Sequence, residues 1–169
     1  MSERVYLCID LKTFYASCEC VMRNLDPFET NLVVADPSRG KGAICLAISP
    51  KLKAMGIRNR CRLFEIPDGI EYITAMPQMK KYMEFSSKIY SIYLRYIAKE
   101  DIYPYSIDEM FLDVTTYLSL YKTTPEKLAK ALMNKIRSEL GLPSACGIGT
   151  NLFLAKVALD ITAKHTKDN

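Results

Sequence analysis

The order of the expected secondary-structure elements constrains the fold of this chain more than any other feature. When residues of about 14–80 are set aside, the rest of the sequence predicts a strand, a helix, two strands, a helix and a strand, followed by a last helix. This order is the split βαβ arrangement of ferredoxin-like sheets. We therefore expect an α/β (α+β) fold, with a ferredoxin-like sheet and a small subdomain inserted after its first strand.

Runs of apolar and β-favouring residues, helical spacing and turn residues place the individual elements. Strands are expected at 5–9, 101–107, 110–114 and 144–148, and helices at 77–98, 125–140 and 151–164. The insertion is expected to hold a helix at 13–23, strands at 32–35 and 43–48, and a short helix from Ser49 to Gly56. The longest helix carries a stripe that predicts a buried face, made of Met79, Tyr82, Met83, Ser86, Ile89, Tyr90, Tyr93, Tyr96 and Ile97.

The composition narrows the class of protein. The chain has 169 residues, of which 49% are apolar and 25% charged, as in a globular domain large enough to bury a core. No apolar run reaches the length of a membrane span. The six cysteines form no C-x-x-C pair and there is one histidine, which favours a cytoplasmic protein without zinc or disulfides.

Positive charge is concentrated in the insertion. The net charge is +4, and the segment 39–62 contains no acidic residue. Its basic residues are Arg39, Lys41, Lys51, Lys53, Arg58, Arg60 and Arg62. A basic lobe beside an α/β sheet is weak evidence for a polyanionic partner such as nucleic acid.

Three acidic residues follow or join the expected central strands. Asp10 ends the first strand, and Asp108 and Glu109 lie at the tip of the hairpin. Because the first strand and the hairpin are neighbours in a split βαβ sheet, these carboxylates can converge on a pair of Mg²⁺ ions, as nucleotidyl transfer requires. The alternative is that Asp10 caps a turn and that the Asp-Glu pair is simply solvated.

Four segments, in this order, resemble motifs of the Y-family (translesion) DNA polymerases. They are Cys8-Ile-Asp-Leu-Lys-Thr-Phe-Tyr-Ala-Ser-Cys-Glu19, Ala47-Ile-Ser-Pro-Lys-Leu-Lys-Ala-Met-Gly-Ile57, Tyr105-Ser-Ile-Asp-Glu-Met-Phe-Leu-Asp113 and Gly147-Ile-Gly-Thr-Asn-Leu-Phe-Leu-Ala-Lys156. The first is most similar to the bacterial branch associated with SOS mutagenesis. The resemblance implies a palm at 1–13 and 81–169 with fingers at 14–80, and we expect the thumb and little finger of the family to be missing from this chain.

The resemblance also implies roles for the acidic residues. Asp10 and Asp108 would bridge two Mg²⁺ ions, Glu109 would complete the site that activates the primer 3′-OH, and the carbonyl of Leu11 would bind the nucleotide-associated ion. Tyr15 matches the steric gate, whose ring would exclude a 2′-OH and so select deoxynucleotides.

Further residues match nucleotide-binding positions of the family. Phe14 would stack near the sugar or pack in the core, and Lys53 stands where the family has a triphosphate-binding arginine. Pro50 replaces a phosphate-binding tyrosine, for which Ser49 could partly substitute. Lys156 and Lys164 would contact the triphosphate, although Lys164 lies one residue later than in many relatives. The alternative for the last two is an exposed ladder with Asp160 at i, i+4 spacing.

The expected function is template-directed DNA synthesis during repair and damage bypass. The partners would be primer–template DNA and dNTPs, with a sliding clamp bound through C-terminal regions that this chain lacks. Because phosphate contacts dominate DNA affinity, we expect the chain alone to extend primers weakly or not at all. The alternatives are another palm-type nucleotide enzyme such as a cyclase, a non-catalytic nucleic-acid-binding module that uses the basic segment, and a structural domain without a ligand.

Overall fold

A computed structural model describes residues 3–161 and divides the chain into two compact units. Of the described residues, 3–12 and 84–161 belong to the split unit, and 13–83 belong to the inserted unit. The limits of the inserted unit differ by one to three residues from the predicted palm and fingers boundaries. The names palm and fingers for the two units remain a prediction. None of the described helices is both long and apolar enough to span a bilayer.

The split unit contains a four-stranded sheet in the order β5-β6-β1-β7, in which all neighbours are antiparallel. Its strands are β1 (Tyr6–Leu11), β5 (Ile102–Ser106), β6 (Glu109–Asp113) and β7 (Ser144–Gly149). The central strands β1 and β6 are almost entirely buried. This order is that of the ferredoxin-like split βαβ sheet, and the predicted fold class is confirmed.

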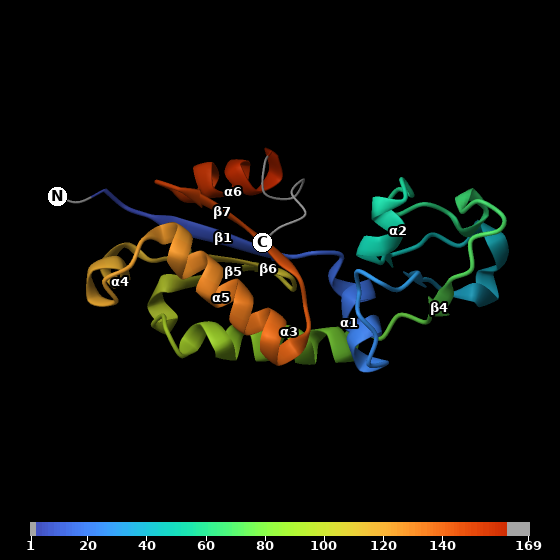
Figure 1. The fold of residues 1–169 in the computed structure, drawn as a ribbon, viewed down its shortest axis with the longest axis horizontal. Coiled ribbons are helices and arrows are strands. Elements are labelled where there is room, and N and C mark those ends of the chain that lie inside the picture. Colours follow the sequence, from blue (N-terminus) through green and yellow to red (C-terminus); the bar gives the residue numbers. More distant parts are fainter. Residues whose placement is uncertain (1–2, 162–169) are drawn as a thin grey trace. The chain divides into compact units, whose positions relative to one another are not determined.

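Helices cover both faces of this sheet (Figure 1). The helices α3 (Met79–Leu94) and α5 (Pro125–Leu140) lie on one side, and α6 (Leu152–Ile161) lies on the other. Local sequence sets the limits of α5, because the Thr124 hydroxyl accepts a hydrogen bond from the Lys127 N–H and Gly141 ends the helix with φ 75°.

Two glycines of β7 let α6 approach the sheet at backbone distance. A Cβ atom on Gly147 would lie 2.2 Å from the Ala155 carbonyl oxygen, and one on Gly149 would lie 2.3 Å from the Ala155 nitrogen. Any side chain at either position would push the helix away from the strand. The Gly-Ile-Gly sequence therefore has a packing reason, and it fixes the height of α6 above the sheet.

The inserted unit contains a small three-stranded sheet in the order β3-β2-β4. Its elements are α1 (Phe14–Met22), β2 (Leu32–Val34), the 3₁₀ helix η1 (Pro37–Gly42), β3 (Ala47–Ile48), α2 (Pro50–Ala54), the 3₁₀ helix η2 (Leu63–Glu65) and β4 (Ile73–Ala75). The strand β2 runs antiparallel to β3 and parallel to β4. A buried cluster that includes Val33, Ile48 and Leu52 forms its core.

The structure differs from the sequence prediction in several elements. The strand expected at 43–48 is reduced to β3, and the helix expected to reach residue 98 ends at Leu94. Beyond that helix, the Ala98 N–H donates to the Tyr117 hydroxyl at 2.8 Å, which holds the chain in a turn. The predicted stripe is buried at Tyr82, Ile89, Tyr93 and Ile97 but exposed at Met79 and Met83.

Two short helices of the split unit were not predicted, and β4 was expected only as one of the extended pieces within 58–77, without bounds. The helices are η3 (Lys99–Asp101), which is 3₁₀, and α4 (Thr115–Leu120). The Asp113 carboxylate accepts hydrogen bonds from the Thr115 N–H at 3.1 Å and from its hydroxyl at 2.6 Å, which starts α4. Asp113 also pairs with Arg4 at 2.8 Å and is therefore a structural residue of the hairpin end.

Candidate active site

Two of the three predicted acidic residues lie directly opposite each other on the central strands. Asp10 of β1 and Glu109 of β6 are register partners in the antiparallel pair. Partners of this kind have side chains on the same face, with Cβ atoms about 5 Å apart. Both residues are nearly buried, with 8% and 6% of their surface exposed. The sheet thus holds two carboxylates side by side where water screens them poorly.

The third acidic residue is joined to the same strand through its backbone. The Leu11 N–H donates to the Asp108 carbonyl at 2.9 Å, so the hairpin turn lies against the end of β1. The Asp108 side chain is half-buried and accepts a hydrogen bond from the Ser106 hydroxyl at 2.9 Å. The structure therefore places Asp10, Asp108 and Glu109 at the same end of β1, which is the position that the element order predicted.

A lysine from α6 reaches this group of carboxylates. The Lys156 ammonium donates a short hydrogen bond to Glu109, lies 3.5 Å from an Asp160 carboxylate oxygen, and stands 5.6 Å from the ring centroid of Tyr105. Burial opposes the charge of Lys156, but the hydrogen bond and the charge of Glu109 outweigh it and raise the pKa of the ammonium.

The sequence did not predict the contact between Lys156 and Glu109, and the proposed triphosphate role of Lys156 remains a prediction. The signal for this contact is the Gly147-Ile-Gly149 packing motif, which brings α6 down onto the carboxylate face. Beneath Lys156 that face continues with Cys8 and Phe111, which pack against Ala155 of α6. Burial, followed by the charge of Glu109, raises the pKa of the Cys8 thiol.

The carboxylate oxygens of Asp10, Asp108 and Glu109 are suitable ligands for a hard divalent cation. In this structure Asp108 and Glu109 are hydrogen-bonded to other residues of the protein. Carboxylate oxygens are the ligands that Mg²⁺ prefers, and closely spaced buried carboxylates require a cation. Within residues 3–161, no three acidic, cysteine or histidine side chains are already gathered around a common point. In the structure the Glu109 carboxylate is bonded to Lys156 and the Asp108 carboxylate to Ser106.

In the inserted unit, the predicted steric-gate residue is part of an aromatic stack. The Tyr15 ring stacks on the Tyr82 ring with centroids 4.7 Å apart and an interplanar angle of 19°. Phe14 is buried, which matches its packing alternative, and its centroid lies 6.0 Å from that of Tyr15.

A fully buried carboxylate anchors the stack. Glu19 accepts hydrogen bonds from the Tyr82 hydroxyl at 2.7 Å, from the Gln78 amide at 2.9 Å and from Arg23 at 2.8 Å. Three donors and the Arg23 charge thus compensate the burial of Glu19. The sequence did not predict this network, because its partners lie up to 63 residues apart.

Lys53 and Ser49, the residues of the inserted unit that are predicted to contact the triphosphate, differ in their exposure to solvent. Lys53 is exposed in α2. The Ser49 hydroxyl is buried, donates to the Thr30 carbonyl at 2.6 Å and accepts from the Leu32 N–H at 3.1 Å. Ser49 therefore supports the backbone in this unit, and a phosphate contact would have to replace these bonds. Lys164 lies outside the described residues.

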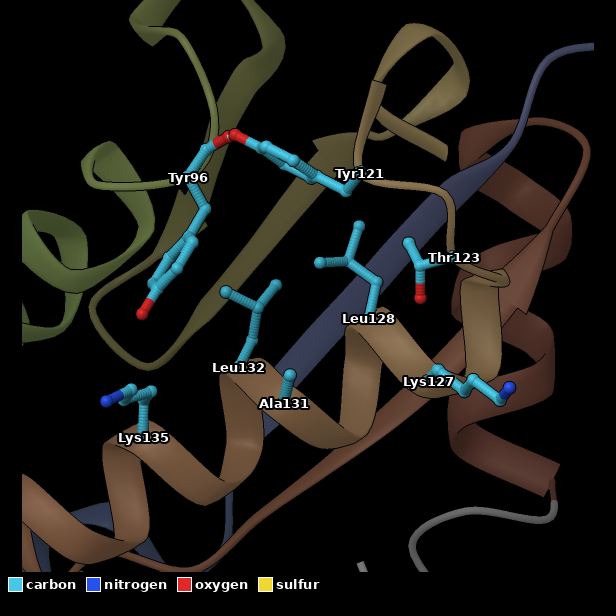
Figure 2. A pocket seen from close by; sticks show the side chains of 8 residues that line it. All are labelled: Tyr96, Tyr121, Thr123, Lys127, Leu128, Ala131, Leu132 and Lys135. Atoms are coloured by element: carbon cyan, nitrogen blue, oxygen red, sulfur yellow. The ribbon is translucent and has the colours of Figure 1, made fainter. Parts of the chain in front are cut away.

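A cavity of about 340 Å³ lies in the split unit, between Tyr96, the segment after α4, and α5. Figure 2 shows Leu128 and Leu132 pointing into it, with Tyr96 and Tyr121 as its walls. The Tyr121 hydroxyl donates to the Tyr96 carbonyl at 2.5 Å, which fixes the two walls together. Of the predicted site residues that the structure describes, none lines this cavity, so it is separate from the carboxylate group.

Comparison with known proteins decides the family. The model of the IMS family, described as impB/mucB/samB, matches residues 9–160. The chain belongs to this family. The matched range contains all three acidic residues, and the resemblance to Y-family polymerases is confirmed.

Two curated relatives of this impB/mucB/samB chain come from Bacillus subtilis (strain 168). UvrX of Bacillus subtilis (strain 168) is 40% identical over 162 residues, covering 95% of this chain and 38% of UvrX. DNA polymerase IV 2 of the same strain is 36% identical over 172 residues, covering 99% of this chain and 40% of the relative. The chain therefore spans about two fifths of the length of these relatives.

Solved structures share the fold. An insertion ternary complex of Dbh DNA polymerase superposes with a TM-score of 0.76 at 22% identity, covering 92% of this chain and 45% of the polymerase. DinB from Sulfolobus solfataricus superposes with a TM-score of 0.74 at 23% identity, again over 92% of this chain. At these identities the comparison supports the fold of the impB/mucB/samB chain.

Proposed function

We propose that this chain is the palm-and-fingers portion of a Y-family DNA polymerase that performs translesion synthesis with dNTPs on primer–template DNA. The observation that carries the proposal is the placement of Asp10 opposite Glu109, with Asp108 joined to the neighbouring Leu11. The family match and the relatives named DNA polymerase IV support it. The split unit would be the palm and the inserted unit the fingers.

The carboxylates would hold two Mg²⁺ ions, which supply stabilisation for the attacking 3′-oxygen and for the leaving pyrophosphate. Asp10 and Asp108 would be shared ligands, the Leu11 carbonyl would serve the nucleotide side, and Glu109 would serve the primer side. Because Asp10 and Glu109 project from paired strands, their spacing is set by the sheet. This preorganisation is what positioning catalysis requires.

Two residues of the inserted unit would act on the nucleotide. Tyr15 would exclude the 2′-OH of a ribonucleotide, and its stack on Tyr82 would keep the ring in place. Lys53 would contribute a positive charge to the triphosphate. As a lysine it lacks the bidentate fork of an arginine, so its contact is less directional.

The proposal is tested by nucleotide binding to this chain. Titration calorimetry with dGTP and with GTP, each with and without Mg²⁺, should show binding that requires the metal and prefers dGTP. Asp108→Asn should abolish the metal-dependent binding, and Tyr15→Ala should remove the preference for the deoxyribose. A cyclase would prefer GTP, so that preference would contradict the proposal.

A matched control uses an exposed acidic residue of the inserted unit. Asp68→Asn removes one negative charge and should leave metal-dependent binding of dGTP unchanged. If Asp68→Asn and Asp108→Asn weaken dGTP binding equally, the binding is a general charge effect and the carboxylate site is wrong.

A further inference from the structure

The Lys156 side chain lies on the face of the sheet that carries Asp10 and Glu109. It is 28% exposed, and the side chain of its partner Glu109 is 8% exposed. A carboxylate this deeply buried is unfavourable without a counter-charge. In this structure the ammonium supplies that charge, and the Cys8 thiol adds a weak hydrogen bond at 3.5 Å.

In the proposed function, the Glu109 carboxylate is also a ligand of a divalent cation. An ammonium bonded to Glu109 and a cation bound by the same oxygens would repel each other strongly at this range. Either Lys156 leaves Glu109, or its presence weakens metal binding. In both cases the free energy of metal binding depends on the position of the Lys156 side chain.

Asp160 and Tyr105 offer a second binding position for the Lys156 ammonium. Asp160 lies one helical turn along α6 from Lys156, with its carboxylate oxygen 3.5 Å from the ammonium. The Tyr105 ring offers its face at 5.6 Å to the centroid and stays in place through an edge-on contact with Phe111. A rotation of the flexible lysine side chain would carry its charge from Glu109 to this pair without moving the backbone.

The backbone around Lys156 is held in position. The close contact of Gly147 and Gly149 with α6 leaves no room for the helix to settle closer to the sheet. The distance between the base of the lysine side chain and Glu109 is therefore set by the fold. Rotation of the Lys156 side chain is sufficient for the exchange.

We propose that Lys156 is a positioning residue which holds the Glu109 carboxylate while no divalent cation is bound and yields it on metal binding, moving its ammonium to Asp160 and Tyr105. This inference rests on the proposed function. Lys156 places a positive charge beside the buried Glu109 carboxylate and orients it before the metal arrives. It also lowers the affinity of the site, because its contact with Glu109 must be given up.

The test is direct Mn²⁺ binding to this chain, followed by the electron paramagnetic resonance signal of the free ion. Lys156→Met removes the competing charge and should bind Mn²⁺ about fivefold or more tightly than the unchanged chain, the lower end of ordinary coupling between two ligands. Lys156→Arg keeps the charge and should stay near the unchanged affinity. Lys135→Met, an exposed lysine of α5, is the matched control and should change nothing.

Further variants distinguish a failure of the inference about Lys156 from a failure of the proposed function. Asp10→Asn should abolish the tight Mn²⁺ site. If it does, but Lys156→Met binds Mn²⁺ equally or more weakly, the inference about Lys156 is overturned and the proposed function stands. If Asp10→Asn has no effect, both fail. Circular dichroism checks folding, and Lys156→Gln replaces the methionine variant if that variant does not fold.

A nuclear magnetic resonance measurement reads the exchange itself. The ¹⁵N resonance of the Lys156 ammonium, assigned by its absence from Lys156→Met, should shift when Mg²⁺ is added. The additional variant Asp160→Asn should reduce the shift, because it weakens the second binding position. A resonance that does not move at saturating Mg²⁺ would overturn the inference.

Discussion

The ring of Tyr15 lies face to face with the ring of Tyr82, with centroids 4.7 Å apart. The Tyr82 hydroxyl is in turn bonded to the buried Glu19 carboxylate at 2.7 Å. Tyr15, which we propose as the residue that selects the sugar, is thereby connected to a buried carboxylate in the interior of the inserted unit. Burial, followed by the bond to Glu19, raises the pKa of Tyr82, so this hydroxyl stays protonated and remains a donor.

Removal of the ring beneath Tyr15 should weaken the selection against ribonucleotides. In Tyr82→Leu the Tyr15 side chain loses its stacking partner and gains rotational freedom, so the ratio of dGTP to GTP affinity should fall. The fall should be smaller than in Tyr15→Ala, because the gate ring is still present. Tyr82→Phe keeps the stack and should retain most of the preference. Equal loss in the phenylalanine variant would show that the stack is not what positions Tyr15.

Loss of the Glu19 carboxylate should strongly destabilise the chain. Glu19→Ala leaves Arg23, Gln78 and Tyr82 without their common acceptor, and breaking a buried ion pair in this way costs about 3–5 kcal/mol. Urea denaturation should show this loss, and Glu19→Gln should lose less because it keeps an acceptor oxygen. The exposed Glu29→Ala should change the free energy of unfolding by less than about 0.5 kcal/mol.

A methyl group on Gly149 should separate α6 from the sheet. Its Cβ would fall 2.3 Å from a backbone nitrogen, and overpacking of this kind costs about 1–3 kcal/mol or more. We expect Gly149→Ala to lower the melting temperature, because α6 can no longer pack at this distance from β7. Gly42→Ala is the control, since a Cβ there meets no atom within 4 Å. A normal melting temperature for Gly149→Ala would contradict the packing explanation.

The stability of the chain should fall at alkaline pH. Burial raises the pKa of Cys20 to about 11 and that of Cys146 to about 12. A thiol whose pKa is higher in the folded state favours folding while it is protonated, so its contribution is complete below the unfolded pKa and is lost as the pH rises toward the folded value. Each such thiol lowers the free energy of unfolding by about 1.4 kcal/mol per pH unit in this window.

Urea titrations between pH 7 and pH 10.5 check this expectation. Cys20→Ala removes one of the titrating groups and should show a shallower decline than the unchanged chain. Lysines and tyrosines titrate in both proteins, so the difference between the two slopes isolates the thiol. Equal slopes would mean that the environment of Cys20 does not favour the protonated form.

The sequence predicted the sheet and the placement of its three acidic residues at one end of β1, because both follow from local patterns and topology. Apolar runs located β1, β6 and β7, and the split βαβ order placed Asp10 beside the hairpin. The bounds of short elements escaped prediction for the opposite reason. The three residues of β4 are too few to show a period, and they become a strand only by pairing with β2.

The side-chain partners could not be predicted in the same way. The contact of Lys156 with Glu109 joins residues 47 apart, and the pairing of Glu19 with Tyr82 joins residues 63 apart. An acidic residue on a helix ordinarily predicts a solvated position, and nothing local reveals that Glu19 is buried. The helix stripe likewise predicted a buried Met83, although its side chain is exposed in the structure.

The split unit is assembled from two chain segments that the inserted unit separates. Its central strand β1 is synthesised before both of its partner strands, which come from residues beyond 100. Pairings of such large sequence separation are entropically expensive to close and slow to form. Asp10 is therefore synthesised long before Glu109 can pair beside it. During synthesis β1 is an unpaired apolar segment to which chaperones could bind.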